Sequence, residues 1–138
     1  MKLGPGLAAV LAMGVAVAMP SSALTGVPKT ACEVSPTEII VSSQAFLGAN
    51  QFPNVLTFSE RGKLVFTHGT SERQSDLADI EVVRYDPVPL VLNLFSLSIA
   101  YRGDGVTRSK SAAYVAVDCL SQLIRRFDSR LTFKHGRW

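Results

Sequence analysis

The densest group of side chains that could do chemistry begins at one of the two histidines. A serine and three acidic residues follow this histidine in the sequence. The group comprises His68, Ser71, Glu72, Asp76 and Asp79. Imidazole and carboxylate groups this close can hold a metal ion or act as a base with its orienting acid. Their spacing matches no established motif, and the chain has no H-E-x-x-H, G-x-S-x-G or P-loop pattern. We therefore expect residues 69–79 to form a polar surface loop, with no catalytic group, metal or cofactor, and keep a small hydrolase or metal-dependent enzyme centred on His68 and the acidic loop 71–79 as the alternative.

Two cysteines, Cys32 and Cys119, are the second chemical feature. Neither is part of a C-x-x-C motif, which disfavours a redox enzyme. In an oxidising compartment two such thiols pair readily, and a bridge between positions this far apart would close a long loop. We predict a Cys32–Cys119 disulfide, with two buried thiols or a contact with another chain as the alternatives.

Charge is distributed unevenly along the chain. Residues 24–101 hold five Lys or Arg against eight acids, whereas residues 102–138 hold eight against three. Such a basic end can face the acidic half of the fold or an anionic partner. The candidate surface for an anionic partner comprises Arg125, Arg126, Arg130 and Lys134.

The N-terminus has the order of properties of a secretory signal peptide. Lys2 precedes an apolar run over residues 7–19, Pro20 ends it, and the small residues before position 24 suit a signal peptidase. The run is shorter than the roughly 20 apolar residues of a transmembrane helix. We predict cleavage after Ala23, leaving residues 24–138 as a single exported domain; export makes a nucleic acid an improbable partner.

The elements that position these residues are read from periodicity. The pattern Ser35-Pro36-Thr37-Glu38 is typical of a helix start and predicts a short helix to about Leu47, although its first residues suit a strand equally. Residues 55–59 and 64–68 predict a hairpin with Gly62 in its turn. Residues 80–85 predict a third strand, and residues 90–101 a central strand that ends at a turn over 103–105.

Two periods compete in residues 112–133. Apolar residues recur every three or four positions from Ala113 to Leu131, which favours a helix with the arginines outside it. The same segment also alternates, as a hairpin would, so helix and hairpin both remain open.

A family resemblance adds to the hairpin interpretation. Residues 108–133 resemble the C-terminal part of surface-adhesin-E-like secreted bacterial proteins, in which an alternating strand ends in Asp-Cys and a basic, aromatic strand follows. The matching positions are Ser109, Asp118, Cys119, Arg126 and Phe133. The resemblance implies a small antiparallel β domain and brings no catalytic residues with it.

These observations predict an α+β fold: a small antiparallel β-sheet domain with one or two short helices, or else an all-β domain, after the signal peptide. The function that fits is an exported, periplasmic or secreted, non-enzymatic protein that binds a ligand or associates with the envelope. Its expected partner is an anionic envelope component or another exported protein, and its membrane contact is a transient one through the signal peptide.

Overall fold

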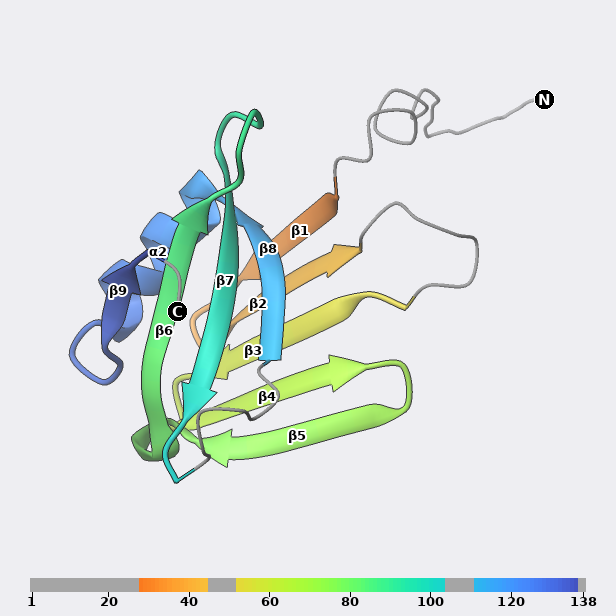
Figure 1. Cartoon of the computed structure of the whole chain (residues 1–138). Helices are drawn as coiled ribbons and strands as arrows, with labels where there is room; N and C mark the ends of the chain where they lie inside the picture. Colours follow the sequence, from red (N-terminus) through yellow and green to blue (C-terminus); the bar gives the residue numbers. More distant parts are fainter. Residues whose placement is uncertain (1–27, 45–51, 104–110, 137–138) are drawn as a thin grey trace. The chain divides into compact units, whose positions relative to one another are not determined.

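Antiparallel strands dominate the computed structural model, which describes residues 28–44, 52–103 and 111–136. Within these residues there are two sheets, one α-helix and one 3₁₀ turn (Figure 1). The predicted signal peptide and its predicted cleavage site lie outside the described residues. The predicted predominance of antiparallel β structure is confirmed.

The first sheet contains five strands in sequence order. They are β1 (Lys29–Val34), β2 (Glu38–Gln44), β3 (Asn54–Ser59), β4 (Lys63–His68) and β5 (Ser71–Asp76). The predicted hairpin is confirmed, because β3 and β4 pair antiparallel with Phe58 opposite Leu64. Its turn needs the glycine, since Gly62 has a φ of 98°.

The predicted helix after Ser35 is wrong: Glu38–Gln44 is strand β2, and the rest of the prediction lies outside the described residues. The Ser35 hydroxyl accepts hydrogen bonds from the Thr37 and Glu38 N–H groups, as a helix cap would, but here it closes the turn between β1 and β2. Alternate residues of β2, among them Ile39 and Val41, enter the core. A β-branched, alternating segment suits a sheet better than a helix.

The predicted polar loop over 69–79 is also wrong in its centre. Residues 71–76 form β5, an edge strand paired antiparallel with β4, and Leu77–Asp79 forms the 3₁₀ turn. A polar strand is stable here because charged side chains suit a sheet edge. In addition, the Arg73 guanidinium lies 3.5 Å from the centre of the buried Tyr101 ring.

The second sheet has the order β8-β7-β6-β9. Its strands are β6 (Ile80–Pro87), β7 (Leu94–Tyr101), β8 (Ser111–Ala116) and β9 (Phe133–His135), of which β9 pairs parallel with β6. The third predicted strand is confirmed as β6. The predicted strand 90–101 begins four residues late, because residues 88–93 form the connection between β6 and β7, where Leu90 and Asn93 have positive φ.

The disputed segment 112–133 forms a helix between two strands and no hairpin, because β8 and β9 lie at opposite edges of the second sheet. It starts in β8, continues as helix α2 (Val117–Phe127) and reaches β9 at Phe133. The Val117 N–H donates to the Asn93 carbonyl, and Asp118 occupies the first turn, where a carboxylate favours a helix N-terminus. The resemblance implied a strand after Cys119, and the structure has the helix there.

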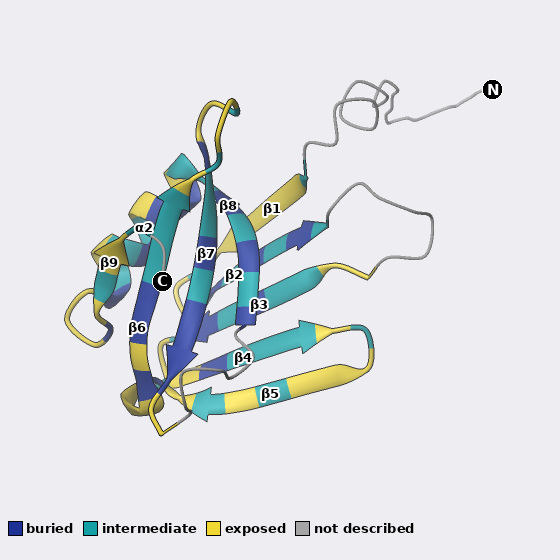
Figure 2. Cartoon of the chain, in the orientation of Figure 1, coloured by how far each residue is buried: buried dark blue, intermediate teal, exposed yellow. Residues whose placement is uncertain are grey.

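One hydrophobic core joins both sheets and the helix. Its largest fully buried side chains include Phe58 from β3, Leu97 from β7 and Phe127 from α2. The buried faces appear dark blue in Figure 2. A polar link also joins the sheets, because the buried Ser43 hydroxyl of β2 accepts a hydrogen bond from the Tyr114 N–H of β8.

Candidate functional site

His68 is exposed and lies at the last position of β4, opposite Asn54 on β3. Its Nδ1 atom is 2.6 Å from the Asn54 amide oxygen, and the ring of Phe52 packs edge-on at 6.3 Å. The bonded partner is therefore an amide and not the carboxylate that base catalysis would use.

The acids after His68 have partners of their own. Glu72 accepts a hydrogen bond from Gln74 at 2.7 Å, and Asp76 forms an ion pair with Lys63 at 2.6 Å. This contact with Asp76 raises the pKa of Lys63 above its usual value, first through the hydrogen bond and then through the charge. Across the described ranges, no group of three His, Cys, Asp or Glu side chains could hold a metal ion. These residues therefore do not assemble a site for the alternative function, a hydrolase or metal-dependent enzyme centred on His68.

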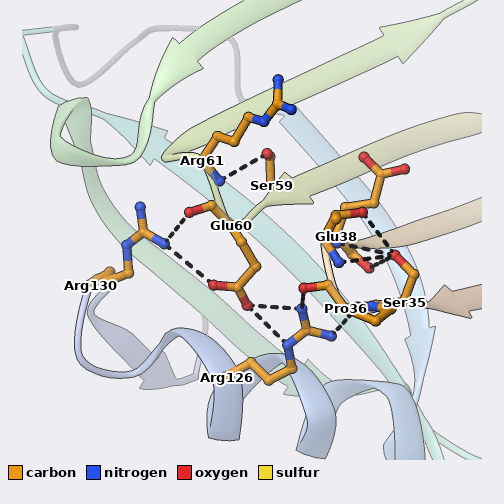
Figure 3. Close-up of polar contacts among 9 residues, drawn as sticks. Ser35, Pro36, Glu38, Ser59, Glu60, Arg61, Arg126 and Arg130 are labelled. Atoms are coloured by element: carbon orange, nitrogen blue, oxygen red, sulfur yellow. Dashed lines mark hydrogen bonds and ion pairs between the residues drawn. The ribbon is translucent and has the colours of Figure 1, made fainter.

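Arg126 of α2 is engaged in contacts inside the protein (Figure 3), whereas its neighbour Arg125 is exposed. Arg126 donates two hydrogen bonds to the same carboxylate oxygen of Glu60, at 3.0 and 2.8 Å. It also donates to the carbonyls of Ser35 and Pro36, at 2.6 and 3.2 Å. Arg126 thereby connects the helix to the β1–β2 and β3–β4 turns, and its place on an anionic-partner surface stays a prediction.

Arg130 is engaged at the same place. Its guanidinium donates to the Glu60 backbone carbonyl at 2.9 Å and lies 3.6 Å from the Glu60 carboxylate. Of the four basic residues proposed, Arg125, Arg130 and Lys134 are exposed to solvent, and Arg130 is at the same time engaged with Glu60. The local sequence does not reveal this division, because Glu60 lies far from both arginines along the chain.

An open cavity of about 350 Å³ lies beside these contacts, between the two turns. Its lining residues are Pro36, Thr37, Glu38, Ser59, Glu60 and Arg61. The Glu60 carboxylate is already bound by two arginines, and the Arg61 side chain points away from this pair in Figure 3. The cavity has mixed charge and brings no nucleophile and base together, so its geometry favours a structural role.

A second surface feature is apolar. Residues 88–93, which we name the hairpin tip, connect β6 to β7 and carry Leu90 and Leu92 at relative exposures of 106% and 89%. This feature was not predicted, because both leucines fall in the segment expected to form a central strand. Pro89 was the available signal, because proline is rare inside a paired central strand.

The predicted disulfide is confirmed. Cys32 of β1 and Cys119 of α2 are joined, with their Cα atoms 6.2 Å apart and a separation of 87 in sequence. All six residues of β1 are exposed, whereas Cys119 is buried. The bond therefore ties an exposed edge strand to the core.

Comparison with known proteins places the chain in no family: no family model and no curated protein matches it. Among the described residues, no helix has the length and apolar character needed to cross a membrane.

Proposed function

We propose that this protein is an exported, disulfide-stabilised binding module that associates with the cell envelope and catalyses no reaction. The N-terminal signal pattern supports export, and the Cys32–Cys119 bond is compatible with an oxidising compartment. The resemblance of residues 108–133 to surface-adhesin-E-like proteins supports the same class of protein.

The observation that carries the proposal is the hairpin tip. Leu90 and Leu92 are two large apolar side chains, two positions apart, that the fold leaves in water. Exposed apolar side chains that cluster are typical of interaction sites. The basic surface of the sequence analysis is now a weaker candidate, because two of its four members, Arg126 and Arg130, bind Glu60.

The test is fractionation of a bacterial host that expresses the full sequence. We expect a product that has lost residues 1–23, contains the disulfide by non-reducing mass measurement, and remains in the washed envelope fraction. The double variant Leu90→Ser/Leu92→Ser should move to the soluble exported fraction.

A matched control removes charge instead of apolar surface. In the double variant Arg125→Gln/Lys134→Gln, two exposed cations of the candidate basic surface are neutralised. This variant should stay with the envelope. An unprocessed cytoplasmic product would contradict export. Envelope association that survives the leucine variant and fails in the charge variant would return the binding surface to the basic residues.

A further inference from the structure

We infer that the hairpin tip inserts into the surface of a lipid bilayer. The inference rests on the proposed envelope association and names the partner. Its first support is chemical: no Asp, Glu, Lys or Arg occurs between Asp86 and Arg102. Transfer of the exposed Leu90 and Leu92 side chains from water to hydrocarbon is therefore not opposed by a charge on the same segment.

Part of the tip backbone is satisfied inside the protein, whereas the N–H groups of Leu90 and Leu92 have no hydrogen-bond partner among the described residues. Pro89 has no N–H, the Val88 N–H donates to the Leu94 carbonyl at 3.0 Å, and the Val91 N–H donates to the Val88 carbonyl at 3.3 Å. The Asn93 carbonyl accepts from the Val117 N–H at 2.9 Å. Each peptide group satisfied inside the protein lowers the cost of leaving water, which is high in hydrocarbon.

Two aromatic side chains, Phe95 and Tyr85, lie behind the tip, both half-buried and packed against the core. Phe95 pairs with Pro87 in the last pair of the β6–β7 ladder, and Tyr85 lies two residues further from the tip, about 7 Å along the strand. The Tyr85 ring is 6.2 Å from that of Phe95 and 5.5 Å from that of His135. The Tyr85 side chain combines an apolar ring with a polar hydroxyl, a combination that favours the boundary between acyl chains and headgroups.

The tip is a convex projection. Leu94, the first residue of β7, pairs with Ala116, the last of β8, so residues 88–93 extend beyond the second sheet at the top of Figure 1. A bilayer accepts such a projection without a complementary pocket. Asp118 is exposed at the start of α2 and directly follows Val117, whose N–H donates to the Asn93 carbonyl of the tip. Its negative charge disfavours anionic lipid. The expected membrane is therefore zwitterionic.

The experiment measures binding of the exported, purified protein to phosphatidylcholine vesicles by co-sedimentation at low and high salt. We expect weak, reversible binding, because two leucine side chains bury less apolar surface than one acyl chain. Salt should leave this binding unchanged, because the tip carries no charge. Leu90→Ser/Leu92→Ser should lower the partition coefficient at least about tenfold. Val34→Ser, which removes a half-exposed apolar side chain on β1, should leave it unchanged.

All variants carry the same N-terminus, so a difference in their partition coefficients reports the effect of the tip. Equal unfolding midpoints confirm that the wild type and the variants are folded. Absence of vesicle binding, or equal binding by the leucine variant, would overturn the inference. Binding that needs phosphatidylglycerol and disappears in high salt would also overturn the inference. A dimer that the leucine variant dissociates would assign the tip to a second copy of the chain. Envelope association that needs Leu90 and Leu92, without vesicle binding, would refute the lipid partner and leave the proposed function standing.

Discussion

At the scale of single residues, Arg126 has the largest set of polar contacts in the site. It is one-fifth exposed and connects α2 to a carboxylate and to two turn carbonyls. Such charge-assisted bonds are stronger than neutral ones, and breaking them leaves the partners unpaired. The residue that the sequence offered for binding a partner is thus used to hold the fold together.

We expect Arg126→Gln to lower the free energy of unfolding by about 1–3 kcal/mol. Its neighbour on the exposed side of the helix provides the control, since Arg125→Gln should change stability by less than about 0.5 kcal/mol. Chemical denaturation measures both. A double-mutant cycle with Glu60→Gln should give a coupling energy between the two side chains, and additive effects would contradict the contact.

The Lys63–Asp76 pair predicts a dependence on pH. Because the pKa of Lys63 is raised in the folded protein, its favourable contribution is complete below the ordinary lysine value of 10.5 and is lost as the pH rises through the raised pKa. Lys63→Gln should therefore be less stable than the wild type at neutral pH. The difference should shrink as the pH rises through the raised pKa of Lys63. A difference that is constant with pH would show that the contact is not electrostatic.

At the scale of elements, the hairpin tip keeps a backbone conformation that its residues do not favour. Leu90 has a φ of 64°, in the left-handed region that disfavours side chains with a Cβ. Leu92 is similarly exposed and does not have positive φ. Strain and exposed apolar surface together are typical of a segment kept for function at the expense of stability.

We expect Leu90→Gly to stabilise the protein by about 0.5–1 kcal/mol, because relief of the strain exceeds the entropy that glycine adds to the unfolded chain. Leu92→Gly is the matched control and should destabilise it. Thermal unfolding of the two variants tests this. Equal effects of the two substitutions would show that the Leu90 conformation stores no strain.

The elements also show where sequence patterns were sufficient. The β3–β4 hairpin was predictable because its strands, turn and glycine are contiguous. Strand β2 was missed because the Ser35 hydroxyl serves a turn as readily as a helix cap, and because the carbonyls of Ser35 and Pro36 bind Arg126, ninety residues away. Strand β5 was missed because its inward residue Arg73 packs on Tyr101, a contact that periodicity does not encode. The side-chain contacts of the candidate site were harder to predict than the strands, because they join residues that are far apart in the sequence.

At the scale of the whole molecule, the disulfide is the main covalent constraint. Its loop spans most of the described chain, and closing a loop of this length restricts the unfolded state most strongly. The edge strand β1, whose residues are all exposed, gains little from burial and depends on this bond and its pairing with β2.

Reduction should lower the free energy of unfolding by about 3–5 kcal/mol. Denaturation with and without reductant measures the change. The double variant Cys32→Ala/Cys119→Ala, whose stability should not respond to reductant, is the control. A loss below about 1 kcal/mol would show that β1 and α2 remain positioned without the bond.

The same bond determines how the molecule responds to tension. A force applied to the two ends of the oxidised chain passes from β1 directly into α2 through Cys32 and Cys119. Strands β2 to β8 lie inside the covalent loop and carry none of the extension. For a protein held at the envelope, a force on its ends would load β9 and the part of α2 after Cys119, which lie outside the loop, and would leave strands β2 to β8, with the leucines at the hairpin tip, in place.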